Sequence, residues 1–307
     1  MIAKFHALSK RRQGEFFQFA GLLLWAFFPI VTVWVNASID PIWQAALATL
    51  FAVPVFAILL TVKNCWSELQ NRAAWLPMII SSLLIGVIFF GLTFTAYRYT
   101  TAGNGSIISL SEVLYSFVFF GLIMRHERYT FSAFLGTILM LIGAGLVLFQ
   151  GSFQPQLGDL ILLGALFLTP IGNYFQQQAR QHVSSGTIMF FRSALSGICL
   201  SIIAFYFNGM PAVNDFSGET LILIAVSGLF FMGISKMLWL EAIHRIPVAH
   251  ANSISAFTPG LTLALAFFIL GEVPTWWQVA GFLPMLAGAW IILNKDFLHT
   301  KLAEVSE

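Results

Sequence analysis

Charged residues are scarce in this chain: Asp, Glu, Lys and Arg together make up 9% of its 307 residues. A soluble domain usually carries about a quarter charged residues. With 58% hydrophobic residues and a mean hydropathy of +0.85, the chain has too few polar side chains to cover a water-facing surface. The composition excludes a soluble globular protein and predicts a membrane protein. Its function must therefore be sought among polar residues inside apolar segments.

Cysteine is almost absent, and the few histidines are scattered. Cys65 lies in a short loop and Cys199 in an apolar segment, which gives neither a disulfide framework nor metal-ligand spacing. No HExxH or GxSxG motif occurs, and Glu112 is the only acidic residue deep within an apolar segment. We therefore expect no catalytic residues, no metal, no cofactor and no nucleic-acid partner, and we expect that the protein is not an enzyme.

Long apolar segments, in contrast, fill most of the chain. A helix needs roughly 20 mostly apolar residues to cross the hydrocarbon core, and it satisfies its own backbone hydrogen bonds there. The runs are too long for sheet-core strands and lack the alternating pattern of a membrane barrel. They predict an all-α polytopic membrane protein with ten transmembrane helices, at residues 16–35, 41–62, 75–97, 102–124, 131–149, 160–178, 186–207, 220–240, 248–270 and 276–293.

The positive residues indicate how the chain is oriented. With ten spans and a cytoplasmic N-terminus, only Arg98 falls on the outer side, while Arg192 and Lys236 fall within spans. This bias follows the positive-inside rule and predicts a multi-pass protein of the cell (inner) membrane with both termini in the cytoplasm. We expect the N-terminal segment to be retained, because it leads into a long span without a small-residue cleavage site. The cytoplasmic side receives Lys4, Lys10, Arg11, Arg12, Lys63, Arg72, Arg125, Arg128, Arg180, Arg245, Lys295 and Lys301.

The chain repeats itself after five spans. The sequence AYRYTTAGNGSIISLSEV at 96–113 aligns with AIHRIPVAHANSISAFTP at 242–259, so that Asn104 meets His250 and Glu112 meets Thr258. Because five is odd, the second copy must enter the membrane from the opposite face, which is a construction typical of secondary transporters. We expect a cytoplasmic segment at 1–15, a first five-helix repeat at 16–150, a second at 156–294 and a cytoplasmic tail at 295–307.

These motifs resemble those of the drug/metabolite transporter superfamily, in its EamA-like branch of ten-helix permeases. The resemblance covers about residues 16–293 and rests on AYRYTTAG at 96–103, the acidic residues Glu127 and Glu272, and the glycine pairs Gly136/Gly143 and Gly281/Gly288. It implies two inverted repeats that move small metabolites, and it leaves the cargo open. The fourth span lacks the proline that often follows its acidic residue in the family, which argues against an unwound fourth helix.

Small residues let membrane helices approach closely. We therefore interpret the glycine pairs, spaced seven apart on one face of the fifth and tenth spans, as packing sites. Near the end of the eighth span, Glu241 and Arg245 are four residues apart, which favours a local salt bridge.

Polar residues inside the spans are the candidates for function. Glu112 lies about 15 Å from the membrane surface at 1.5 Å per residue, either as a neutral residue bonded between helices or as a cavity residue that contacts substrate or carries a proton. Lys236 either faces the cavity, snorkels to the interface or forms a structural ion pair. For Arg192 the structural and functional interpretations stand level. The candidate substrate-binding residues are Trp25, Asn104, Glu112, Tyr115, Asn173, Lys236, Trp239, His250, Asn252 and Phe257.

We expect a secondary transporter that moves small organic metabolites, first among them amino acids or related compounds, by alternating access. The alternatives are a channel or a non-transporting receptor for a small molecule. A channel lacks support because no filter-like loop or charged ring occurs, and a receptor because no soluble module does. The expected partners are a small-molecule substrate and membrane lipid; proton coupling and a homodimer stay open.

The charge distribution makes a direct prediction about topology. A reporter active only in the periplasm should be silent at the C-terminus and active when fused after Asn36 or after Ser152, because ten spans return the chain to its starting side. Activity of the C-terminal fusion outside the cell contradicts the ten-span arrangement.

Overall fold

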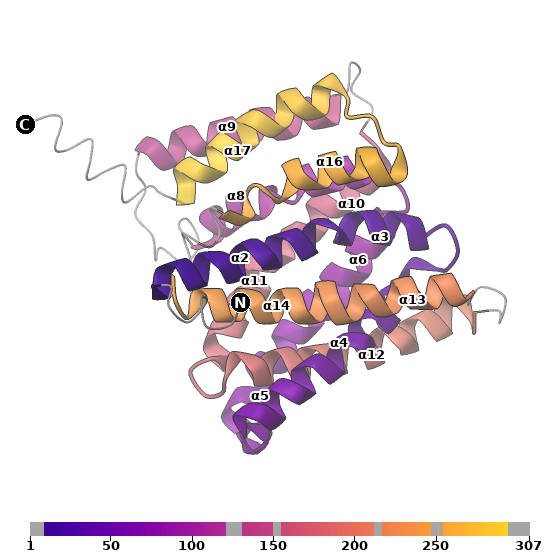
Figure 1. Cartoon of the computed structure of the whole chain (residues 1–307), viewed down its shortest axis with the longest axis vertical. Coiled ribbons are helices and arrows are strands. Elements are labelled where there is room, and N and C mark those ends of the chain that lie inside the picture. The colour runs from indigo at the N-terminus through magenta and orange to yellow at the C-terminus, as the bar shows by residue number, and fades with distance from the viewer. Residues whose placement is uncertain are drawn as a thin grey trace, which may run out of the picture.

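The computed structural model describes residues 9–120, 131–149, 155–211, 217–246, 251 and 254–293, and the regular elements in these ranges are helices. They lie side by side across the molecule (Figure 1). Most are α-helices, whereas η1 is a 3₁₀-helix and η2 and η5 are π-helices. In chain order they are α2 (Lys10–Ala26), α3 (Phe28–Val35), α4 (Pro41–Lys63), η1 (Trp66–Gln70), α5 (Arg72–Ser81), η2 (Ser82–Phe89), α6 (Phe90–Ala96), α7 (Ala102–Ile108), α8 (Ser111–Val118), α9 (Phe131–Phe149), α10 (Leu157–Leu166), α11 (Leu168–Ala179), α12 (Ser185–Asn208), α13 (Gly218–Val226), η5 (Ser227–Ile234), α14 (Ser235–Ile243), α16 (Thr258–Leu270) and α17 (Trp276–Leu293).

These elements join into ten apolar spans. Six continuous stretches of 23 to 26 residues are long and apolar enough to cross a membrane, and they form the first, second, third, sixth, seventh and eighth spans. Helices α7 and α8 form the fourth span, and α9, α16 and α17 form the fifth, ninth and tenth. The prediction of an all-α fold with ten transmembrane helices is confirmed.

The first and sixth spans are each broken near the middle, next to a proline. Helix α2 gives way to α3 just before Pro29, and α10 gives way to α11 just before Pro170. Proline has no N–H group and cannot complete the helical ladder. The carbonyl of Leu166, four residues before Pro170, accepts a hydrogen bond from Thr169 Oγ1 at 2.8 Å instead. The two repeats therefore share a bend at the same place.

The third and eighth spans share a different irregularity. The π-helix η2 separates α5 from α6, and the π-helix η5 separates α13 from α14. Both begin at a serine, Ser82 and Ser227. Single π-turns inside α-helices are frequent at functional sites. Lys236 follows η5 almost directly, as the second residue of α14. The π-helix of the eighth span therefore lies beside the lysine that the sequence singled out.

The fourth span is divided by one tighter turn. Helix α7 ends at Ile108 and α8 begins at Ser111. Ser109 and Leu110 between them keep right-handed helical backbone angles, and the backbone continues with shorter-range bonds such as Glu112 N–H to Ser109 O at 3.1 Å. Ser109 Oγ also donates to the Gly105 carbonyl at 2.8 Å. The fourth helix is therefore tightened at this turn and not unwound, in line with its lack of a proline.

Helix packing repeats when the two halves are exchanged. Helix α2 packs on α14 as α10 packs on α6, and α4 packs on η5 as α12 packs on η2. Counterpart spans also meet directly: α4 of the second with α12 of the seventh, and α7 of the fourth with α16 of the ninth. Helices α9 and α17 of the fifth and tenth spans lie side by side (Figure 1). Helices α4 and α12 run antiparallel, because Trp43 Nε1 at the start of α4 donates to Gly209 O at the end of α12, at 3.0 Å. The two five-helix repeats are therefore inverted with respect to each other.

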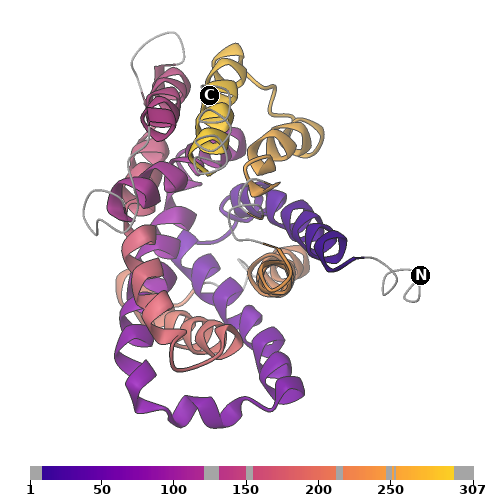
Figure 2. The same ribbon diagram turned by 90° about the vertical axis from the view of Figure 1, so that its left-hand side faces the viewer.

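Two hydrophobic clusters hold this arrangement, and each draws on both repeats. The first lies mainly among the first, second, third, seventh and eighth spans and includes Phe28, Phe56 and Phe231. The second lies mainly among the fourth, fifth, sixth, ninth and tenth spans and includes Met140 and Met285. Figure 2 shows the eighth span nearly end-on. Helix α2 lies beside it, at the boundary between the two groups of spans.

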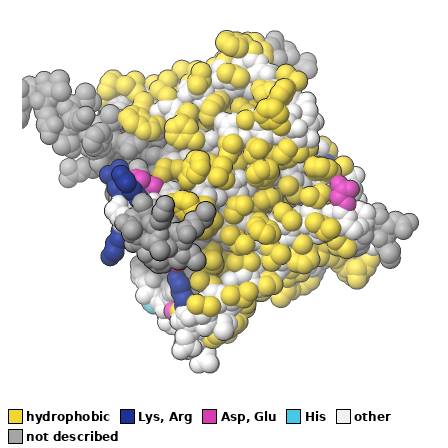
Figure 3. Space-filling view, viewed as in Figure 1, with side chains coloured by type: hydrophobic (Ala, Val, Ile, Leu, Met, Phe, Trp, Pro, Cys, Tyr) yellow, Lys and Arg dark blue, Asp and Glu magenta, His cyan; other side chains and the backbone are white. Residues whose placement is uncertain are grey.

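The outer surface is apolar and its charges gather at the ends. Large side chains such as Phe268, which is 80% exposed, cover the flanks, and Lys and Arg side chains gather where α2 begins (Figure 3). We call this the basic end; among the described residues it carries Lys10, Arg11, Arg12, Lys63, Arg72, Arg180 and Arg245. The opposite or acidic end carries Asp40, Asp159, Glu219, Glu272 and Arg98. An apolar belt between two polar ends fits a lipid bilayer.

The glycine pairs pack as expected. A Cβ atom added to Gly143 would lie 2.5 Å from Gly281 O, and one added to Gly136 would lie 2.8 Å from Gly288 O. Real carbon atoms do not approach a carbonyl oxygen so closely, so α9 and α17 touch backbone to backbone. This contact leaves no room for any side chain.

Gly143→Leu and Gly288→Leu should therefore lower folded yield and melting temperature, since overpacking usually costs about 1–3 kcal/mol or more. Substrate preference should stay unchanged. The matched control is Gly145→Leu, because Gly145 lies on the same helix with no atom within 4 Å of an added Cβ. Normal stability with altered specificity would place these glycines on the transport pathway.

Candidate functional site

The centre of the molecule contains a lysine held against an aromatic ring. Lys236 Nζ lies 3.5 Å from the centroid of the Trp25 ring. Trp25 in turn stacks on Phe28, with ring centroids 4.7 Å apart. An ammonium group over a tryptophan face is stabilised by about 0.5–2 kcal/mol. Trp25 lies near the end of α2, just before the bend, and α2 packs on α14, so the first and eighth spans meet at this contact.

Glu112 approaches the same region from the other repeat. It lies in the first turn of α8, near the Thr169 and Asn173 side chains of α11. Glu112 and Lys236 attract each other electrostatically, but the ion pairs found among the described residues do not include them. The two charges therefore face the same region without forming a direct salt bridge there.

Arg192 is the functional candidate that the sequence left undecided. Its Nη1 donates to Gln176 Oε1 at 3.1 Å, and its Nη2 lies 2.9 Å from the Met189 sulfur. It lines a cavity of about 10 Å³ together with Lys236. Arg192 was absent from the candidate residues, although a cation about seven residues inside a span was the signal that pointed to it. The described residues hold no group of three or more His, Cys, Asp or Glu suited to a metal ion.

The structure separates the remaining candidates into different places. Asn173 joins Glu112. Tyr115 packs edge-on against Phe167 at 5.8 Å, and Trp239 packs against the first hydrophobic cluster. Phe257 is 58% exposed at the start of α16, while His250 and Asn252 lie outside the described residues. The residues brought together in the centre are thus Trp25, Glu112, Asn173, Lys236 and Arg192.

Asn104 belongs to a buried network at the acidic end. Its side chain is 1% exposed; Nδ2 donates to Asp159 at 3.4 Å, and Oδ1 accepts from Gln278 Nε2 at 2.8 Å. Asp159 also accepts a short hydrogen bond from the Thr100 hydroxyl. The network joins the fourth span of the first repeat to the sixth and tenth spans of the second. Both polar atoms of the Asn104 amide are therefore occupied by protein partners.

Glu272 closes the same end from the loop between α16 and α17. Its carboxylate accepts the backbone N–H groups of Ala102 at 3.2 Å and Gly103 at 3.3 Å, at the start of α7. Hydrogen bonds to an ionised acceptor are roughly twice as strong as neutral ones. This acidic turn, which the resemblance singled out, thus ties the second repeat to the first.

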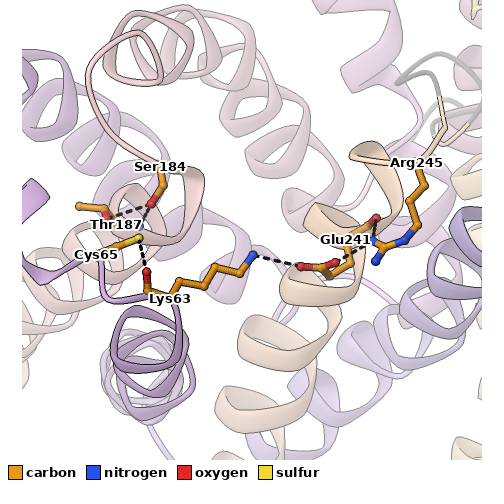
Figure 4. Close-up of polar contacts among 6 residues, drawn as sticks. All are labelled: Lys63, Cys65, Ser184, Thr187, Glu241 and Arg245. Atoms are coloured by element: carbon orange, nitrogen blue, oxygen red, sulfur yellow. Dashed lines mark hydrogen bonds and ion pairs between the residues drawn. The ribbon is translucent and has the colours of Figure 1, made fainter. Parts of the chain in front are cut away.

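The basic end holds a cavity of about 180 Å³. Three segments line it: the end of α4, the loop before α12, and α14. Glu241 bridges two cations there, with Lys63 Nζ at 3.2 Å and Arg245 Nη1 at 2.6 Å, as Figure 4 shows. The predicted salt bridge between Glu241 and Arg245 is confirmed. Lining residues include Leu59, Lys63, Arg180, Ser185, Met237 and Glu241.

A second carboxylate fixes the loop beside this cavity. Glu68 accepts hydrogen bonds from Ser184 N–H at 2.8 Å and Thr187 Oγ1 at 2.5 Å. Partial burial raises the pKa of Glu68, but these hydrogen bonds outweigh it and hold the pKa below its usual value near 4.5. Glu68 is thus ionised at neutral pH and anchors the start of α12.

The two cavities lie along the same helices. Residues of α4, α12 and α14 line both of them. Lys236 at the small cavity and Leu240 at the large one are four residues apart on α14, which is about 6 Å along the helix axis. Polar contacts therefore join the repeats at both ends, and the larger of these two cavities lies at the basic end.

An inverted pair of five-helix repeats defines a polytopic membrane protein, and this construction is common among transporters. A family model described as the EamA-like transporter family matches the chain twice, over residues 12–149 and 156–294. The chain belongs to the EamA-like transporter family. It is therefore a membrane transporter of a small molecule.

Relatives and a solved structure agree with this assignment. An uncharacterized transporter of Synechocystis sp. is 24% identical over 71% of this chain, and the match spans 65% of that relative's length. Uncharacterized transporters of Bacillus subtilis and Archaeoglobus fulgidus are 20% and 22% identical over 81% and 84% of this chain, and 83% and 90% of their own. A protein of known crystal structure matches 92% of this chain and 96% of its own, with a TM-score of 0.67 at 17% identity, which shows the shared fold.

The network at the acidic end predicts the effect of Asn104→Ala. The change leaves Asp159 and Gln278 with a missing partner in a buried place, which costs about 1–3 kcal/mol, so the melting temperature should fall by several degrees. Asn208→Ala is the control, because Asn208 is exposed at the same end of the bundle. Equal melting temperatures for the two variants would show that the network does not hold the repeats together.

Proposed function

We propose that this protein carries small organic metabolites, first among them amino acids or related compounds, across the cell (inner) membrane by alternating access. The observation that carries the proposal is the meeting of Glu112 from the first repeat and Lys236 from the second in the interior, beside Trp25. Charged groups at membrane depth usually mark substrate or ion pathways. Secondary transporters bind substrate where inverted repeats meet.

The chemistry of this centre suits a zwitterion. Lys236 offers an ammonium group to a substrate carboxylate, and Glu112, with Asn173 beside it, offers a carboxylate to a substrate amine. Trp25 supplies an apolar wall, and in our proposal Tyr115 and Trp239 extend it. Small-molecule sites usually combine such apolar walls with a few placed polar groups. In our proposal Glu112 also carries a coupled proton, since it is an acidic side chain within a membrane span.

The two ends supply the alternation. The contacts of Asn104, Asp159 and Glu272 join the repeats at the acidic end, whereas the basic end holds the larger cavity. Transport would require the acidic end to separate while the cavity at the basic end closes. The distribution of Lys and Arg supports a cytoplasmic basic end, and the repeats at 16–150 and 156–294 would then move against each other.

Substrate can be identified by thermal-shift screening of the purified protein against a metabolite library, because a ligand stabilises the folded state by mass action. The compounds that raise the melting temperature then enter uptake measurements in proteoliposomes. Saturable, competable uptake supports a carrier, while an unsaturable electrogenic conductance would favour a channel. Binding without uptake would favour a receptor.

Glu112→Gln and Lys236→Met should each lower uptake about tenfold or more, because loss of one charge-assisted contact is worth about 1.5–3 kcal/mol. Expression and melting temperature should stay near normal. If the two residues served only as a structural pair, each single variant would lose several kcal/mol of stability and the double variant would recover it. Glu219→Gln is the control, since Glu219 is exposed at the acidic end. Unchanged uptake in both single variants excludes them from the site.

A further inference from the structure

Two cations share one small cavity in the interior. Arg192 from α12 and Lys236 from α14 both line the cavity of about 10 Å³, and Thr49, Gly86 and Ser196 contribute to its wall. The two positive groups repel each other. Both side chains are partly buried, and neither forms an ion pair among the described residues. Two like charges close together and removed from water are unfavourable unless an anion joins them.

The neighbours of these cations are almost all neutral. Lys236 rests on the Trp25 ring, and Arg192 contacts Gln176 and Met189. The hydroxyl of Thr49 donates to Ala45 O at 2.7 Å, so it is occupied by the backbone. Glu112 is the acidic group that acts on Lys236. Two positive charges against one negative charge leave an excess of positive charge.

We propose that this cavity is a carboxylate-binding subsite, in which the Arg192 guanidinium and the Lys236 ammonium hold the acid group of the transported compound. The inference rests on the proposed function and narrows its substrate class. A guanidinium presents a planar fork of N–H donors that matches a carboxylate, and the two donors of Arg192 already in use leave others free. Glu112 stays available for an amine, so amino acids and related acids fit while their amides do not.

Space for the acid group comes from the same movement that transport requires. The cavity now admits one oxygen-sized group, since a water needs about 10–15 Å³. Its wall includes Gly86 of η2, where an added Cβ would overlap Ser196 of α12. The first repeat therefore lies against the second with no spare room. As η2 and α12 separate, the cavity widens next to the two cations.

A purely structural explanation for Arg192 makes different predictions. In that explanation the Arg192–Gln176 hydrogen bond clamps α11 to α12, and the charge itself has no ligand. Removal of the guanidinium would then lower the melting temperature of the empty protein. In the subsite, removal of one of two repelling cations leaves the melting temperature of Arg192→Gln equal to or above that of the unmodified protein.

The test is a thermal-shift titration of the purified protein with probes that differ only in the acid group. Leucine and glutamate are compared with leucinamide at constant ionic strength, set with sodium chloride. The carboxylate probes should raise the melting temperature with concentration, while leucinamide should not. In Arg192→Gln and Lys236→Met the concentration needed for the same rise should increase about tenfold or more. Arg192→Lys should recover part of the effect, because it keeps the charge and loses the fork.

Arg72→Gln is the matched control, since Arg72 is an exposed arginine at the basic end that lines neither cavity; it should behave like the unmodified protein. Equal shifts from leucine and leucinamide, no shift from any carboxylate probe, or an undiminished response in Arg192→Gln would overturn the subsite. Uptake in proteoliposomes separates this failure from failure of the proposed function. Carboxylate-dependent stabilisation without uptake supports the subsite and overturns the proposed carrier function. Uptake without preference for the acid group supports the carrier function and overturns the subsite.

Discussion

The structure depends on one constraint: hydrocarbon supplies no hydrogen bonds, so a backbone group freed inside the bilayer must find a partner in the protein. The sixth span meets this constraint with a side chain close in sequence. Pro170 has no N–H group for the Leu166 carbonyl, which accepts a hydrogen bond from Thr169 Oγ1 instead. A local hydroxyl group thus permits a bend in the middle of the membrane.

The spans and their inversion were predictable from sequence because they rest on long-range averages. Twenty apolar residues define a span whatever their order, and an odd repeat unit fixes the inversion by counting. The tighter turn in the fourth helix was not predictable in this way. Proline is the strong signal for a broken helix, whereas no residue type marks the change to shorter-range backbone bonds at Ser109 and Leu110. The π-helices η2 and η5 carry no distinctive residue beyond Ser82 and Ser227.

The candidate site was predictable in part for a similar reason. The cost of burying charge singles out Glu112 and Lys236 from sequence, and the structure gives both of them interior places. Asn104 met the same polar-in-span criterion, yet its amide is occupied by Asp159 and Gln278. Which polar residue is occupied and which faces open space depends on neighbours from distant spans. Arg192 is the opposite case: it was not among the candidates from sequence, yet it shares a cavity with Lys236.

The contact between α9 and α17 is reciprocal: the carbonyl of Gly281 faces the Cα of Gly143, and the carbonyl of Gly143 faces the Cα of Gly281. An added side chain on either helix therefore collides with the backbone of the other. No enlargement on one side can be offset by a smaller residue opposite, since glycine has nothing left to remove. The two halves of the chain can drift apart in sequence at most aligned positions, as Asn104 and His250 have done. At these glycines both repeats require the same residue, because a side chain in either repeat would collide with the backbone of the other.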